Sequence, residues 1–137
     1  MSIEEENKRA SSETLISTDS QPGLLDERKT TDPRVRIAID FMLANLHRKI
    51  SLIDLGRKVN LSAAHVSRLF SIETGLSPSE YLIRLRMENA RRLLATSLLS
   101  IKEIMALSGY NNRGHFVQHF KRYFMRTPSD YRRSLSS

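Results

Sequence analysis

The feature that most limits the fold of this chain is an internal repeat with a period of about 50 residues. In the first copy, SLIDLGRKVNL begins at residue 51, SAAHVSRLF at 62 and LSPSEY at 76. The matching segments of the second copy are SIKEIMALSGY from residue 100, NRGHFVQHF from 112 and RTPSDY from 126. The offset changes by one residue between the first two blocks, where a turn tolerates an insertion. We therefore expect both copies to adopt the same local structure.

Each copy carries the signals of three consecutive helices. Ser51 and Ser100 each precede a short apolar run and have an acidic residue three positions later, which is typical of a helix N-terminus. A tight turn and a second helix follow. The sequence Ser77-Pro-Ser-Glu then provides a cap, a proline in the first turn and a glutamate three residues after the cap. The second copy begins its last helix at Thr127-Pro128 in the same way.

A further helix is expected before the repeat. Asp32 can cap it and Pro33 suits its first position. Apolar residues then recur at helical spacing, namely Val35, Ala38/Ile39, Met42 and Leu46. No stretch has strand periodicity, so the sequence predicts an all-α protein of about seven helices.

Each copy also contains enough apolar residues for a small core. The expected core residues are Leu52, Leu55, Val59, Leu61, Val66, Leu69 and Phe70 in the first copy, and Ile101, Ile104, Leu107, Tyr110, Phe116 and Phe120 in the second. The long helix that starts after Ser77 has its own apolar stripe of Tyr81, Leu82, Leu85, Ala90, Leu93 and Leu94. At the end of the first short helix, Asn60 and Gly109 suit a left-handed backbone.

Charge divides the chain into two parts. Residues 1–33 hold 4 Lys/Arg and 8 Asp/Glu, a net charge of −4, whereas residues 34–137 hold 18 Lys/Arg and 7 Asp/Glu, a net charge of +11. Residues 1–31 are rich in Ser, Thr and Glu, and we expect a disordered acidic and polar N-terminal arm there. The basic part indicates a polyanionic partner, either a nucleic acid or an anionic membrane face.

Other features of the composition favour an intracellular protein. The chain has no cysteine, so it forms no disulfide framework and no cysteine-based metal site. It starts without the basic-then-apolar pattern of a secretion signal. No apolar run approaches the roughly 20 residues that a membrane-spanning helix needs, so we expect no membrane partner and a cytoplasmic location.

A short helix, a tight turn and a second helix form the helix-turn-helix plan, in which the second helix enters the DNA major groove. We place the first such motif at about 51–75, a linker helix at about 78–97 and the second motif at about 100–124, within a domain that spans 32–135. At 1.5 Å per residue, some 19 helical residues of the linker span about 28 Å, close to the ~34 Å between successive major grooves on one side of a duplex. Two second helices could therefore lie in adjacent grooves.

The arrangement resembles the DNA-binding domain of the AraC/XylS family of bacterial transcription regulators. SLIDLGRKVNLSAAHVSRLFSIETGLSPSEYLIRLRMENARRLL, then SIKEIMALSGYNNRGHFVQHFKRYF and RTPSDYR, carry the resemblance over residues from about 35 to 133. It implies two homeodomain-like helix-turn-helix subdomains joined by a linker helix. One departure is Met125, because family members usually have glycine there, as this chain does at Gly75. The second motif should then end its second helix differently or be less stable.

The resemblance also implies a function. We expect a sequence-specific regulator of transcription, an activator in the manner of the family, that reads a bipartite promoter site in double-stranded DNA. A single chain could bind such a site as a monomer. RNA polymerase is a candidate second partner, and the bacterial nucleoid is the expected location.

The resemblance implies which residues contact DNA. Base contacts are expected at the positions of Ala64, Ser67, Arg68, Arg113, Gly114, Val117 and Gln118. Arginine suits guanine and glutamine suits adenine, and Gly114 permits close backbone approach. Phosphate contacts, which position the protein without specifying sequence, are expected from Arg57, Lys58, Ser62, Lys121 and Arg122.

Several alternatives remain open. The exposed arginines could be solvated surface residues, and the basic surface could belong to a general nucleic-acid-binding or adaptor module without base specificity. His115 and His119 are spaced as two metal ligands on one helix face, but no third ligand is evident, so we expect no metal and no cofactor. The sequence contains no paired carboxylates, no nucleophile with a nearby base and no phosphate-cradling glycine loop, so we do not expect an enzyme. About 31 polar residues precede the helices, which suggests a stand-alone regulator or a fragment of a longer chain.

Overall fold

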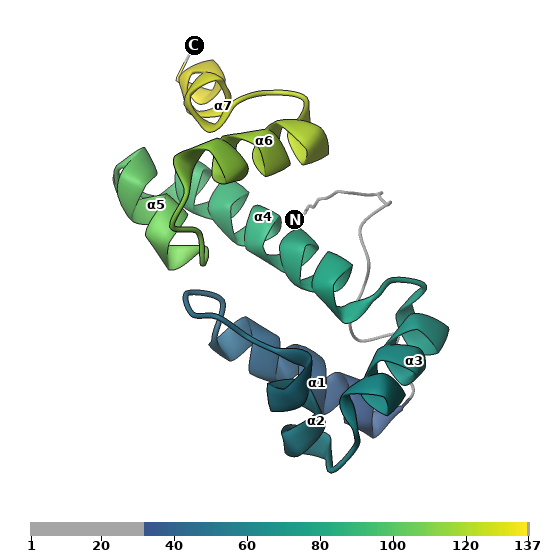
Figure 1. Cartoon of the computed structure of the whole chain (residues 1–137). Coiled ribbons are helices and arrows are strands. Elements are labelled where there is room, and N and C mark those ends of the chain that lie inside the picture. Colours follow the sequence, from purple (N-terminus) through teal and green to yellow (C-terminus); the bar gives the residue numbers. More distant parts are fainter. Residues whose placement is uncertain (1–31, 137) are drawn as a thin grey trace. The chain divides into compact units, whose positions relative to one another are not determined.

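A computed structural model describes residues 32–136 of the chain. It contains seven helices, shown in Figure 1: α1 Pro33–Ala44, α2 Leu52–Val59, α3 Ala63–Thr74, α4 Pro78–Thr96, α5 Ile101–Leu107, α6 Arg113–Phe124 and α7 Pro128–Leu135. The described residues include no β-strand, which confirms the all-α prediction. The arm expected at 1–31 lies outside the described residues. No helix in 32–136 is both long and apolar enough to span a membrane.

Side-chain caps begin six of the seven helices in the same way. In each, the cap oxygen accepts a hydrogen bond from the backbone N–H three residues later, the caps being Ser51, Ser62, Ser77, Ser100, Asn112 and Thr127. Three of these N-termini are complete capping boxes, closed by Asp54, Glu80 and Glu103. Of the two asparagines that could start α6, the structure selects Asn112, whose Oδ1 lies 2.9 Å from the backbone nitrogen of His115.

Helices α3 and α6 end with the same left-handed residue geometry. Gly75 has φ 79° and Met125 has φ 62°, and the backbone N–H of each donates a 2.8 Å hydrogen bond to the carbonyl four residues earlier. Met125 therefore does not end α6 differently from α3, so that alternative is wrong. Its side chain is 80% exposed, and burial does not compensate the backbone strain.

Helix α4 supplies half of the core of the second motif. Met87, Ala90 and Leu94 from α4 are buried together with Ile104 of α5 and with Phe116 and Phe120 of α6. Helix α4 contacts α5, α6 and α7, and it also contacts α3. The linker is therefore a structural part of the second helix-turn-helix motif as well as a connection to the first.

Of the thirteen core residues expected in the two copies, six are buried, six are half-buried and one is exposed. In the first copy Leu55, Val66 and Phe70 are fully buried. In the second copy Leu107 is 46% exposed, so its assignment to the core was wrong. Ser108 is buried instead, because it follows Ile104 by four residues on the inner face of α5. Met87, which was not in the expected stripe of α4, is fully buried.

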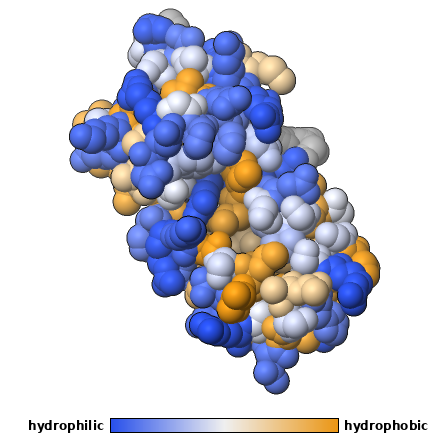
Figure 2. Space-filling view, viewed as in Figure 1, coloured by the Kyte–Doolittle hydropathy of each residue, from blue (hydrophilic) through white to orange (hydrophobic). Residues whose placement is uncertain are grey.

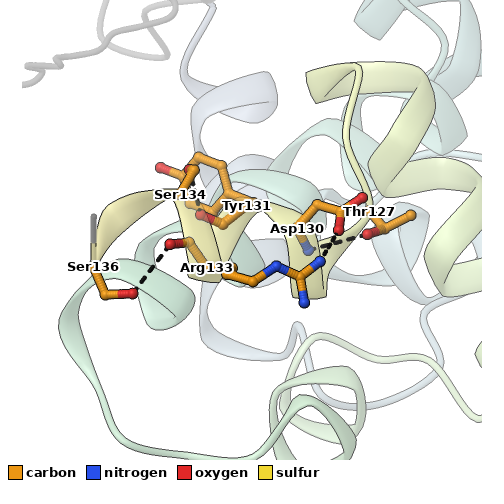
Figure 3. A network of polar contacts seen from close by, with 6 residues as sticks. All are labelled: Thr127, Asp130, Tyr131, Arg133, Ser134 and Ser136. Atoms are coloured by element: carbon orange, nitrogen blue, oxygen red, sulfur yellow. Dashed lines mark hydrogen bonds and ion pairs between the residues drawn. The ribbon is translucent and has the colours of Figure 1, made fainter.

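Helix α7 has local polar contacts on one side and packs on the other. Figure 3 shows the cap at Thr127, the Asp130–Arg133 ion pair, and the hydroxyls of Ser134 and Ser136, which donate to carbonyls of the same helix. On the opposite side the ring of Tyr131 lies 5.9 Å from that of Phe120. Helix α7 thereby covers the core that α4, α5 and α6 form.

Candidate nucleic-acid interface

Helix α3 has one face in the core and one face in solvent. Val66 and Phe70 point inward and are buried. Of the predicted base-contact residues, Ala64 and Arg68 are exposed and Ser67 is half-buried. Within residues 32–136, Arg68 makes no hydrogen bond and no ion pair, so its guanidinium is available to a ligand.

Helix α6 has the same division. Phe116 and Phe120 are buried, whereas Arg113, Gly114 and Gln118 are exposed and Val117 is half-buried. A Cβ atom at position 114 would lie 3.2 Å from Oδ1 of Asn112, the cap of the helix. Glycine there adds no side chain to the first turn of α6 and leaves the cap undisturbed. We call α3 and α6 the reading helices.

The predicted phosphate contacts of the first motif surround the turn between α2 and α3. Arg57 and Lys58 lie in the last turn of α2, and Ser62 caps α3. The Lys58 ammonium is 5.0 Å from the centroid of the Phe41 ring. Because Oγ of Ser62 already accepts the N–H of His65, its hydroxyl hydrogen is the group left to donate to a phosphate.

A glycine that sequence reasoning missed holds this turn in shape. A Cβ atom at Gly56 would overlap the carbonyl oxygen of Leu61, and the Gly56 carbonyl accepts the N–H of Leu61 at 2.9 Å. The two chain segments therefore touch backbone to backbone.

In the second motif, Lys121 and Arg122 are exposed in the last turn of α6, at the end opposite to its cap.

Figure 2 shows that hydrophilic residues cover most of the visible surface over α6 and α7. Such a surface can remain in water and can also contact a polyanion, since the folded part of the chain carries an excess of positive charge. A surface of this kind fits the electrostatic part of nucleic-acid binding, which does not depend on sequence.

The two histidines of α6 are packed against each other and one of them is held by a tyrosine. The His115 and His119 rings are stacked with centroids 6.5 Å apart, and Nδ1 of His119 lies 2.6 Å from the hydroxyl oxygen of Tyr110. Burial lowers the pKa of His119 and raises the pKa of Tyr110 to about 12. This contact ties the turn before α6 to the helix itself. Among the described residues no three metal-ligating side chains cluster together.

Arg86 is a structural arginine that the sequence prediction overlooked. Its Nε and one terminal nitrogen donate to the carbonyl oxygens of Leu46 and Arg48, at 3.2 and 2.7 Å, and burial lowers its pKa. The sequence did contain a signal, because position 86 is four residues from buried Leu82 and four from buried Ala90. An arginine within an apolar stripe indicates a long-range polar contact.

Arg132 of α7 has a related role at the other end of α4. Its guanidinium donates to the carbonyl oxygens of Leu99, Ser97 and Leu94, at 2.5, 3.2 and 3.3 Å. Carbonyls in the last turn of a helix have no partner within the helix. Arg132 therefore satisfies the C-terminus of α4 and the segment that leads into α5.

Comparison with known proteins identifies a helix-turn-helix domain, in agreement with the geometry. Residues 55–134, more than half of the chain, match the family model of the helix-turn-helix domain. The chain is 32% identical over 102 residues to the lactose operon transcription activator of Staphylococcus xylosus, covering 74% of this chain and 37% of that protein. It spans well under half the length of the curated relatives that it matches, 28% to 38% for three of them.

Two solved structures have closely similar folds. An AraC-type transcriptional regulator from Chromobacterium violaceum superposes with a TM-score of 0.71 at 30% identity, over 77% of this chain and 94% of that chain. The DNA-binding domain of the global transcription factor AdpA, solved in complex with a target DNA, superposes with a TM-score of 0.70 at 29% identity, over 76% and 93%.

Proposed function

The chain belongs to the AraC family of helix-turn-helix transcription regulators, which act by binding DNA and not by catalysis, and we propose that it reads a bipartite promoter site with α3 and α6 in adjacent major grooves. The observation that carries this proposal is the pair of reading helices, each with a buried aromatic face and an exposed polar face. Both are attached to the 19-residue helix α4.

The length of α4 supports the bipartite arrangement. A helix of 19 residues is about 28 Å long, which approaches the ~34 Å between adjacent major grooves on one side of B-form DNA. One chain can therefore occupy both grooves, and the protein would bind as a monomer. A flexible linker of the same length would not hold the two helices at one spacing.

Specific side chains are assigned to base reading and to positioning. We propose that Arg68 and Arg113 contact guanine and that Gln118 contacts adenine, because these side chains match the hydrogen-bonding edges of those bases. The remaining base-contact positions are Ala64, Ser67, Gly114 and Val117. Phosphates would be contacted by Arg57, Lys58, Ser62, Lys121 and Arg122.

We further propose that the protein activates transcription, as the Staphylococcus xylosus relative does according to its name. Activation requires a second contact, for which RNA polymerase is the natural partner of a promoter-bound protein. A regulator with double-stranded DNA as its target would act in the bacterial cytoplasm, at the nucleoid.

Arg68→Ala tests base reading directly. We expect the substitution to weaken binding to the specific site by about 1–3 kcal/mol, because a bidentate arginine–guanine contact is lost, and to leave binding to random duplex DNA nearly unchanged. Fluorescence anisotropy with a site chosen by in vitro selection would measure both affinities at fixed salt. Arg92→Ala is the matched control, since Arg92 is exposed on α4 and its side chain bonds only to that of Asn89 in the described part of the chain.

Equal losses of affinity on the selected site and on random DNA would contradict the assignment of Arg68 to base reading. The alternative function is a general nucleic-acid-binding or adaptor module without base specificity. In that case in vitro selection would enrich no sequence, and structured RNA would compete as well as duplex DNA. A helix-turn-helix protein should prefer the duplex, because the major groove of A-form RNA is too narrow for a helix.

A further inference from the structure

We propose that Arg86 and Gly109 set the spacing between the two half-sites, by locking the loop that follows α1 to the turn that precedes α6. We call this contact the junction, and it consists of Arg86, Gly109 and the loop of residues 45–51. The proposal rests on the proposed function, since a preferred spacing requires a site with two halves. Arg86 and Gly109 are positioning residues that act through the reading helices.

Arg86 joins α4 to the loop with a two-pronged contact. Its two donors meet the carbonyl oxygens of Leu46 and Arg48, which are 40 and 38 residues away in the sequence. A guanidinium is planar and rigid, so two simultaneous hydrogen bonds define both the distance and the direction of the loop from α4. Within residues 32–136 the Arg86 side chain has no carboxylate partner. Its hydrogen bonds go to neutral carbonyl oxygens, so they fix the position of the loop and do not neutralise the charge of the arginine.

Gly109 brings the second motif against the same loop. A Cβ atom at this position would overlap the carbonyl oxygen of Leu46 and would lie 2.6 Å from Nε of Arg86. The turn before α6 therefore touches both partners of the Arg86 contact. Only three residues separate Gly109 from Arg113, the first residue of α6, so the position of this turn determines where α6 begins.

The repeat shows that backbone conformation alone does not require glycine at position 109. The equivalent residue of the first copy is Asn60, which has φ 60° where Gly109 has φ 86°. Asparagine tolerates this left-handed conformation. At position 109 the Leu46 carbonyl and Arg86 come so close that a Cβ would overlap them, which leaves no room for a side chain. Glycine at this position is thus explained by the junction.

The junction is a second attachment between the two motifs. The first runs through α3 and the start of α4, where the Phe70 and Tyr81 rings lie 5.2 Å apart. One attachment permits a hinge motion, whereas two attachments on different segments remove it. An open pocket of about 560 Å³ adjoins the junction, and Arg86 and Gly109 line it together with His47, Lys49 and Tyr110 among others.

The experiment measures affinity against spacing. Duplexes would carry the two half-sites obtained by in vitro selection, separated by spacers that change one base pair at a time, together with each half-site alone. Wild-type protein should show one optimal spacing. Arg86→Met should reduce the preference for that spacing by roughly tenfold, because linked binding depends on the geometry of the connection, while affinity for single half-sites stays within about twofold.

Two further variants separate geometry from charge. Arg86→Lys keeps the positive charge but cannot donate in the same fork, so it should resemble Arg86→Met. Arg92→Met removes a charge from the same helix without touching the junction and should keep the wild-type optimum. Recovery of the spacing preference in Arg86→Lys would mean that Arg86 acts through its charge on DNA, and it would overturn the proposal.

A glycine pair tests the same junction independently. Gly75→Ala and Gly109→Ala both place a Cβ at positive φ, 79° and 86°, but nothing lies within 4 Å of the one at position 75. Both should lower the melting temperature, and only Gly109→Ala should broaden the spacing preference. Circular dichroism would confirm that each variant is folded. If Gly109→Ala does not fold, Arg86→Met still tests the junction.

The outcomes distinguish this inference from the proposed function. If wild-type protein selects only a single half-site, the bipartite function fails and the inference fails with it. If wild-type protein has an optimal spacing that Arg86→Met and Gly109→Ala both retain, the bipartite function stands and the inference is wrong.

Discussion

Met125 has a backbone conformation that glycine has at the equivalent place in the first copy of the repeat. Its φ of 62° is in the left-handed region, where the Cβ of an ordinary residue comes too close to the next carbonyl oxygen. Its side chain lies in solvent, so no packing offsets that strain. Methionine at the end of α6 therefore lowers the stability of the protein relative to glycine at the same position.

Met125→Gly should stabilise the protein by about 0.5–1 kcal/mol. The left-handed penalty of roughly 1–2 kcal/mol is removed, and the greater freedom of glycine in the unfolded chain returns part of it. Urea denaturation followed by circular dichroism would measure the change in the free energy of unfolding. Gly75→Met, the reverse exchange at the same place in the first copy, should destabilise by a similar amount. A loss of stability in Met125→Gly would show that the methionine side chain makes a useful contact.

The capping boxes make the N-termini of α2, α4 and α5 sensitive to acid. The carboxylates of Asp54, Glu80 and Glu103 accept the backbone N–H of Ser51, Ser77 and Ser100 respectively. These hydrogen bonds lower the pKa of each carboxyl group below its ordinary value of 3.8 or 4.5. A lowered pKa in the folded state means that the unfolded chain binds protons more readily.

The stability of the protein should therefore fall on acidification. The contribution of the three carboxylates is fully present above about pH 5 and is lost as the pH falls through their lowered pKa values, because each must be protonated. Melting temperatures measured from pH 7 to pH 2 would test this. Glu80→Gln and Glu103→Gln should each be less stable at pH 7 and show a shallower decline. A decline as steep as that of the wild type in both variants would exclude the capping boxes as its cause.

At the scale of the whole molecule, long-range arginine contacts connect the elements. Arg86 attaches α4 to the loop after α1, and Arg132 attaches α7 to the end of α4. Both arginines donate to backbone carbonyls that have no partner in a regular helix or strand. The arrangement of the helices around α4 thus depends on two side chains as well as on the apolar core.

Arg132→Met should lower the free energy of unfolding by about 2 kcal/mol, because carbonyls at the end of α4 lose hydrogen bonds from a charged donor. Arg133→Met is the matched control in the next position. Arg133 is exposed and pairs with Asp130, as Figure 3 shows, and such surface pairs contribute at most about 1 kcal/mol. Chemical denaturation of both variants would compare them. Equal losses would mean that Arg132 does not support α4.

Much of the local structure could be predicted because it depends on residues close together in the sequence. A cap and its acceptor are three residues apart, and the turn at Asn60 depends on one residue that tolerates a left-handed backbone. The repeat strengthened each of these predictions, since two copies supplied the same signal. The exposed polar faces of α3 and α6 also followed from helical periodicity.

The sequence by itself determined the seven helices, their order and the family to which they belong. Only the tertiary structure decided what Arg86, Arg132 and Gly109 do, and that Leu107 faces solvent while Ser108 is buried. The physical reason is that these arginines bind backbone carbonyls, which every residue possesses and no sequence pattern marks. Similarly, the space around Gly109 is limited by a loop more than sixty residues earlier in the chain. Such contacts exist only once the helices have packed.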